Sequence, residues 1–164
     1  AEGAQLAAGV RLDAGAVGKG IALDAAARAL VAGGATAVWF DFGGSSQLAW
    51  SGGTRPRAVV VAGVAEGVVH GVLEFDDGAL ATSRASGAGA AQGPIVDPRS
   101  GAPVPGPRLA TVRCRDATSA DVWSTALVVR GRGALAAAQR SGCEALVEDG
   151  DGVVVSAGFW GGAR

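Results

Sequence analysis

Short apolar runs separated by glycine-rich turns extend through the whole chain. Runs with the length and composition of strands occupy residues 37–42, 57–64, 68–75, 109–114, 144–148 and 153–156. Glycine accounts for 28 of the 164 residues, as expected where many tight turns and close backbone approaches are needed. Residues 10–14 are expected to form one more short strand. Asp76-Asp77-Gly78 is expected to form a hairpin turn from which 79–82 returns as a strand.

Two longer segments have helical spacing. The first helix is expected to run to about Val31, with apolar residues four apart at Val17, Ile21, Ala25 and Ala29 and with Leu30 beside them. The second is expected from about Ser119 to Val129, with a further helix at 133–141. Because strands, helices and hairpins are mixed and no linker or repeat interrupts them, the pattern favours one layered α+β domain over residues 1–164 rather than a doubly wound sheet.

Charge and hydropathy exclude two classes of partner. The net charge is −1 and no basic run occurs, so the electrostatic signature of a nucleic-acid-binding protein is missing. No apolar stretch approaches the ~20 residues that span a bilayer. The chain has no signal peptide and no initial methionine, which predicts a processed product or a fragment whose compartment cannot be read from the sequence.

Cysteine and histidine are too scarce for several common sites. Cys114 and Cys143 cannot form a disulfide framework, and we interpret them as buried, inert thiols, with a single bridge or a reactive thiol as the alternatives. His70 is the only histidine, so a histidine-based zinc site or a Ser-His-Asp triad is not expected. A core or exposed position is the expected role of His70.

The first candidate site is the glycine-rich turn at 13–20. It leads into a helix, where backbone N–H groups favour an anion and glycines allow a phosphate to approach, and Lys19 adds a charged donor. The alternative is a tight turn with an exposed lysine. Neither the Walker A spacing nor GxGxxG occurs here.

The second candidate site is on the predicted helix at 118–125. Asp121 and Thr125 are four residues apart and therefore project from one face. A carboxylate and a hydroxyl are hard oxygen ligands of the kind that hold Mg²⁺ together with substrate phosphates. The alternatives are a capping box formed by Thr118 and Asp121, and a Thr125 hydroxyl that bonds back to a carbonyl.

The third candidate site joins a strand end at 81–84 to a proline-rich turn at 93–101. Asp97 lies in an Asp-Pro-x-x-Gly sequence, a turn in which the carboxylate can cap its own backbone. A serine at a strand end, such as Ser83, is usually structural. The turn is therefore a weak signal by itself.

Three blocks in register resemble the FAD:protein FMN transferase (ApbE) family. Residues 12–30 resemble its glycine-rich block with a lysine and a following aspartate. Residues 81–83 and 94–104 resemble its Thr-Ser-Gly strand end and its His-Ile-Ile-Asp-Pro-x-x-Gly turn. Residues 118–131 resemble its Ala-Asp-x-x-x-Thr-Ala helix, and 152–159 its C-terminal strand. The resemblance implies a mixed, mostly antiparallel sheet packed with helices.

The resemblance also implies an activity: Mg²⁺-dependent cleavage of FAD, with FMN attached to a Thr or Ser hydroxyl of a target protein and AMP released. Some relatives instead hydrolyse FAD to FMN and AMP. The implied metal ligands are Asp121, Thr125 and the carbonyl near Gly18, and Asp121, Thr125 and Lys19 are the implied catalytic residues. Positions matching the nucleotide site are Gly18, Lys19, Asp24, Gly43, Gly44, Ser83 and Asp97.

The chain departs from the family pattern at four places. Pro94 replaces the histidine before Ile-Ile-Asp-Pro, and Arg84 replaces the glycine after Thr-Ser, where it would crowd the nucleotide or grip a phosphate. Ser45 replaces an aspartate after the Gly-Gly loop, and the family's N-terminal region is missing. The transferase has three alternatives: a catalytically weak or inactive flavin-binding homologue, an FAD pyrophosphatase, or a fragment completed by a partner segment. Family members are often exported or membrane-anchored; with no signal in this chain, a cytoplasmic location stays open.

Overall fold

A six-stranded antiparallel sheet forms the centre of the protein. The computed structural model describes residues 5–52, 54–86 and 93–161. The strands follow the order β1-β2-β5-β8-β9-β10, and every pairing is antiparallel. Their bounds are Val38–Phe42, Ser46–Trp50, Gly78–Arg84, Leu109–Cys114, Glu144–Asp149 and Gly152–Val155.

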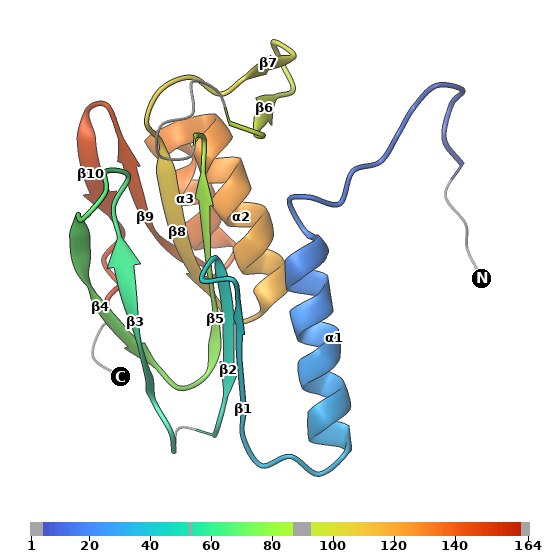
Figure 1. The fold of residues 1–164 in the computed structure, drawn as a ribbon, viewed down its shortest axis with the longest axis vertical. Helices are drawn as coiled ribbons and strands as arrows, with labels where there is room; N and C mark the ends of the chain where they lie inside the picture. The colour runs from blue at the N-terminus through green and yellow to red at the C-terminus, as the bar shows by residue number, and fades with distance from the viewer. Residues whose placement is uncertain (1–4, 53, 87–92, 162–164) are drawn as a thin grey trace.

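Helices cover one face of this sheet. The helices α1 (Gly18–Ala32) and α2 (Ala117–Arg130) pack against each other, and α2 lies over β5 and β8 (Figure 1). A short 3-10 turn, η1 (Gly131–Ala134), and α3 (Leu135–Arg140) follow α2. The core between helices and sheet is built from small and medium side chains, including those of Leu23, Leu48, Ala81, Ala120 and Leu127.

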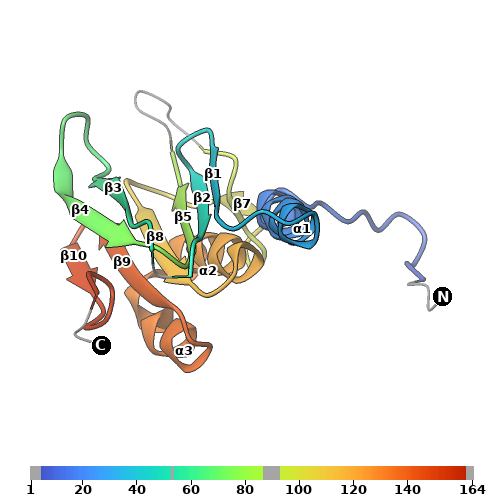
Figure 2. The same cartoon turned by 90° about the horizontal axis from the view of Figure 1, so that it is seen from below.

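A two-stranded ribbon covers the opposite face. The ribbon consists of β3 (Arg57–Ala62) and β4 (Val69–Phe75), which pair only with each other (Figure 2). Larger side chains fill the core beneath it, among them those of Leu73, Phe75, Leu109 and Phe159. A small hairpin of β6 (Val96–Asp97) and β7 (Ala102–Pro103) completes the strands. The predicted α+β fold with a mostly antiparallel sheet is therefore confirmed.

Two local predictions are wrong, and one strand was not expected. Residues 10–14 form no strand; they are exposed and run away from the body with no neighbouring strand to pair with (Figure 1). The strand β2 was not predicted, because its first residues, Ser46 and Gln47, are polar and yet buried. The segment after Asp76 and Asp77 does not return beside β4: it crosses to the central sheet, where β5 pairs with β2 and β8.

The predicted apolar face of α1 is also wrong. The helix buries Gly20, Leu23, Asp24 and Ala27, whereas Ile21 is half exposed. In an alanine-rich helix small apolar residues occur on every side, so periodicity selects no single face. The close approach to α2 selects it instead.

The two cysteines form a disulfide rather than free thiols. Cys114 ends β8, Cys143 precedes β9, and their Cα atoms lie 4.5 Å apart. The bridge joins neighbouring strands across a sequence separation of 29 residues. Separately, no helix in the described part of the chain is long and apolar enough to cross a membrane.

Candidate active site

The N-terminal end of α1 lies directly against the N-terminal end of α2. A Cβ atom built at Gly20 would lie 2.4 Å from the carbonyl oxygen of Ala117 and 2.6 Å from the Cα atom of Thr118. No side chain fits at such distances, so glycine at position 20 is a steric requirement of this α1–α2 junction. Gly20 of the glycine-rich block therefore has a role in helix packing that does not depend on a ligand.

At the junction, each helix has a carboxylate that accepts hydrogen bonds from backbone amides of the other helix. Asp121 of α2 accepts a hydrogen bond from the amide of Gly20, in the first turn of α1, at 3.1 Å. In return Asp24 of α1 accepts from the amides of Ala117 and Thr118, both at 2.9 Å. Amides in a first helical turn lack intrahelical partners, and a carboxylate placed there is also stabilised by the positive end of the helix dipole. Each aspartate thus stabilises the start of the other helix.

Asp121 also forms an ion pair with Lys19. Its Oδ1 atom lies 3.1 Å from the Lys19 Nζ atom; the Asp121 side chain is 2% exposed and that of Lys19 32% exposed. The structure therefore brings Asp121 to the glycine-rich turn. The capping-box alternative is wrong, because Asp116 is the N-cap of α2 and accepts the Ser119 amide at 2.7 Å.

Three hydroxyl groups meet one turn further along α2. The Ser83 Oγ atom lies 2.7 Å from that of Ser124 and 3.1 Å from the Thr125 Oγ1 atom. Ser83 reaches α2 because alternate residues of β5 face the helices. It is Ser124, and not Thr125, that bonds back along the helix, to the carbonyl oxygen of Asp121 at 2.9 Å. The sequence reading missed Ser124, although its i, i+3 spacing from Asp121 places both on one face.

The Gly43-Gly44 turn lies next to the strand that carries Ser83. Both glycines have positive φ angles, 62° and 69°, which side-chain-bearing residues rarely adopt. The carbonyl oxygen of Ser45 accepts the amide of Thr82 at 2.8 Å. This bond places the predicted Gly-Gly loop beside the end of β5.

Arg84 faces away from this site. By strand alternation it projects to the ribbon side of the sheet, opposite to Ser83. Its guanidinium donates to the carbonyl oxygens of Gly63 and Val64, at 2.9 Å and 3.2 Å, between β3 and β4. Arg84 therefore anchors the ribbon, and its expected effect on a phosphate has no support in this arrangement.

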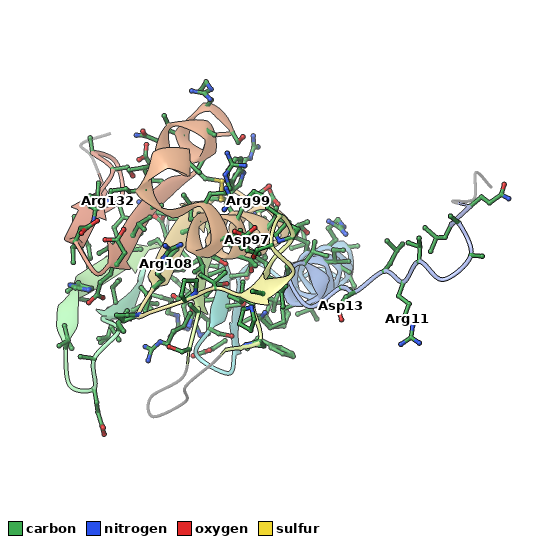
Figure 3. All side chains as sticks on the ribbon, turned by 90° about the horizontal axis from the view of Figure 1, so that it is seen from above. Arg11, Asp13, Asp97, Arg99, Arg108 and Arg132 are labelled. Carbon is green, nitrogen blue, oxygen red and sulfur yellow. A yellow bond between two sulfur atoms is a disulfide. The ribbon has the colours of Figure 1, made fainter. Side chains whose placement is uncertain are left out.

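Asp97 is engaged by Arg99 in the β6–β7 hairpin. Figure 3 shows the two side chains together, and Arg99 donates to the carboxylate from its backbone amide and its guanidinium. These hydrogen bonds lower the pKa of Asp97 from 3.8 to about 2. The predicted turn is confirmed. No hydrogen bond or ion pair among the described residues joins Asp97 to Lys19 or Asp121.

His70 lies on the ribbon and is not part of the candidate site. Its Nε2 atom lies 2.7 Å from the Oε2 atom of Glu148, which also accepts the amide of Val64 at 2.8 Å. The pair fastens the ribbon to β9. Since the chain has no other histidine, no imidazole serves the α1–α2 junction.

The side chains at the junction suit a magnesium ion that also binds substrate phosphates. No group of three or more His, Cys, Asp or Glu side chains in the described ranges could hold a metal ion by itself. One buried carboxylate and one part-exposed hydroxyl nevertheless match the usual Mg²⁺ site, in which waters and phosphates supply the other ligands. Gly18 is the first residue of α1 and therefore belongs to this turn.

An open hollow of about 970 Å³ borders the junction on one side. Its lining includes Asp24, Arg28, Trp50, Arg113 and Glu144. Neither Lys19, Asp121 nor Thr125 lines it. Asp24 lines the hollow, and its carboxylate is hydrogen-bonded to the first residues of α2.

These features define an α+β protein in which a buried carboxylate and a group of hydroxyls lie at the junction of two helices. The chain belongs to the ApbE family, whose sequence profile matches residues 3–147. The fold resembles the ApbE protein of Thermotoga maritima with a TM-score of 0.82 and 26% identity, over 93% of this chain and 53% of that one.

Two further solved structures agree. The flavinyl transferase ApbE of Pseudomonas stutzeri matches with a TM-score of 0.69 and 26% identity, over 94% of this chain and 53% of that one. The flavin transferase ApbE of Vibrio cholerae, at 24% identity and a TM-score of 0.70 over 88% and 50%, supports the fold alone. The chain thus spans about half the length of these relatives. No curated protein sequence matches it significantly.

Proposed function

We propose that this chain takes part in flavin transfer as a Mg²⁺-dependent FAD:protein FMN transferase. FAD is the donor, a Thr or Ser hydroxyl of a target protein is the acceptor, and AMP is released. Family membership and the flavin transferases among the similar structures support the proposal. The observation that carries the proposal is the contact between Asp121 and Lys19. This contact brings a carboxylate that can bind Mg²⁺ next to a glycine-rich turn that can bind phosphate.

The reaction needs positioning and charge neutralisation more than covalent chemistry. The acceptor oxygen forms a bond to the FMN phosphorus, the phosphoanhydride bond to AMP breaks, and the acceptor proton passes to solvent. A bound Mg²⁺ would polarise the phosphoryl oxygens and stabilise the leaving AMP. Asp121 and Thr125 would hold the ion, Lys19 would turn from Asp121 to the phosphates, and Gly18 would add its carbonyl.

The remaining residues of the proposed site act through the backbone or through packing. Ser83 would line the nucleotide beside Thr125, and the Gly43-Gly44 turn would border it. Asp24 would hold the junction together rather than contact the ligand, since its oxygens already accept three donors of α2. Asp97 would meet the ligand only after releasing Arg99.

FAD hydrolysis is the second candidate activity, and one observation favours it. Pro94 replaces the family histidine and His70 is paired with Glu148 on the ribbon, so no imidazole of this chain assists the acceptor hydroxyl. Water, at high concentration, could then replace the protein acceptor. A homologue that binds flavin without turnover would have the same residues at this site.

The test is AMP release from FAD, with and without Mg²⁺ and with a Thr-containing acceptor peptide. Asp121→Asn keeps the shape of the side chain but removes its charge, and Asp151→Ala removes an exposed carboxylate of the β9–β10 turn as a matched control. We expect Mg²⁺-dependent AMP release that falls at least a hundredfold in Asp121→Asn and is unchanged in Asp151→Ala. Flavin on the peptide identifies the transferase, and free FMN the hydrolase. Mg²⁺-independent release, or equal activity in Asp121→Asn, would refute the proposed site.

A further inference from the structure

The hydroxyl groups of Ser83, Ser124 and Thr125 form a chain whose direction can be deduced. A serine or threonine hydroxyl has a single hydrogen to donate and two lone pairs to accept with. The Ser124 hydrogen is committed, because the carbonyl oxygen of Asp121, 2.9 Å away, can only accept. Ser124 is therefore the acceptor in its 2.7 Å contact with Ser83.

The same reasoning fixes the next bond. The hydrogen of Ser83 is used on Ser124, so Ser83 must accept in its 3.1 Å contact with Thr125. Thr125 is then the donor. The order runs from Thr125 to Ser83, from Ser83 to Ser124, and from Ser124 to the backbone of α2.

The consequence is a Thr125 oxygen with its hydrogen turned toward β5 and both lone pairs left for another partner. A hydroxyl that binds a divalent cation must present a lone pair to it and send its hydrogen elsewhere. Ser124 is fully buried, whereas Thr125 is part-exposed. Water therefore has little access to the anchored end of the chain, while a ligand can reach the free end.

We propose that Ser124 is a positioning residue for the cation, and this inference rests on the proposed function. Ser124 does not touch the ion. It sets the orientation of the Thr125 lone pairs through Ser83, and it draws that orientation from the main chain of Asp121, whose side chain is the other ligand. Removing its hydroxyl frees the Ser83 hydrogen, so that Thr125 loses its enforced direction.

The experiment measures Mn²⁺ affinity by the electron paramagnetic resonance signal of the free ion, with and without FAD. Variants are Ser124→Ala, Thr125→Val and the double variant, and unfolding curves check that each is folded. Ser141→Ala is the matched control, because the Ser141 hydroxyl, like that of Ser124, donates to a preceding backbone carbonyl, here that of Ala137 at the exposed end of α3. Orienting partners of metal ligands typically contribute ~10–100-fold in affinity, and we expect about tenfold weaker binding for Ser124→Ala.

The double variant separates positioning from general damage. If Ser124 acts through Thr125, Ser124→Ala has no further effect on affinity once Thr125→Val is present. Equal, additive losses in the two backgrounds, or wild-type affinity in Ser124→Ala, would overturn the inference while leaving Asp121 and Thr125 as ligands. A wild-type chain that binds no Mn²⁺ with or without FAD would overturn both this inference and the proposed function.

Discussion

Replacing Gly20 by alanine tests the α1–α2 junction directly. The added methyl carbon would lie 2.4 Å from the Ala117 carbonyl oxygen and 2.6 Å from the Thr118 Cα atom. Both are backbone atoms and cannot rotate away. To restore a contact of 3.4 Å, where ordinary van der Waals distances begin, the helices must separate by about 1 Å.

That separation has an energetic consequence that can be estimated. Inserting a methyl group into a packed contact costs ~1–3 kcal/mol, while alanine gains up to ~1 kcal/mol over glycine in helix propensity. A shift of this size also takes the Gly20 amide beyond hydrogen-bond distance of Asp121, and a bond to a charged group contributes ~1.5–3 kcal/mol. We expect Gly20→Ala to lower the free energy of unfolding by about 2–4 kcal/mol.

Gly18→Ala is the control in the same helix. Its methyl carbon would meet only the Ala14 Cβ atom, at an ordinary 3.6 Å, so stability should be unchanged or slightly raised. Urea unfolding followed by tryptophan fluorescence measures both variants. Equal stability of Gly20→Ala and wild type would show that the helices do not meet as described, and that Asp121 does not depend on this contact.

Three further predictions concern single charges and the disulfide. Lys19→Met removes the cation that now neutralises Asp121. The Mg²⁺ affinity without nucleotide should therefore rise about fivefold, the factor given by an ion pair of ~1 kcal/mol, while the FAD affinity falls. Calorimetry that shows both affinities lowered would contradict this. Arg99→Ala should return the pKa of Asp97 from about 2 toward 3.8. In the wild type the stability from this carboxylate is present above pH 3.8 and is lost as the pH falls through about 2, and in the variant most of it is absent at every pH. A carboxyl NMR titration unchanged from wild type would exclude the pairing. Cys143→Ser opens a loop of 29 residues and should cost about 3–4 kcal/mol by loop entropy, measured by urea unfolding, whereas reducing agent should have no effect on that variant.

Strand periodicity was informative where one face of a strand is apolar and failed where buried positions are polar. The segments at 109–114 and 144–148 are apolar and were predicted to within a residue of β8 and β9. The β2 strand opens with Ser46 and Gln47, which are 2% and 3% exposed. Polar residues in the middle of a sheet have the composition of a turn, and nothing local distinguishes them from one.

Long-range contacts explain the other failures. The residues of the Gly20–Asp121 hydrogen bond are 101 positions apart, so local patterns could indicate a carboxylate and a glycine-rich turn but not their contact, which only the family resemblance implied. The spacing of Thr118 and Asp121 fits a capping box, and only the tertiary structure shows that Asp121 caps α1 instead. Arg84 is different: alternation along the expected strand already places it on the face opposite to Ser83, and only its contacts with Gly63 and Val64 required the tertiary structure. The extent of the domain, taken as residues 1–164, stays a prediction.

The position of a bound cation is the most direct measurement of the central claim. Crystals grown with Mn²⁺ and FAD, or with Mn²⁺ and the products FMN and AMP, would locate the ion by its anomalous scattering. The expected result is a single strong peak ligated by a carboxylate oxygen of Asp121 and the hydroxyl of Thr125, with Lys19 moved from Asp121 to a phosphate. A peak elsewhere, or a bound nucleotide beside an unbroken Lys19–Asp121 pair, would contradict it.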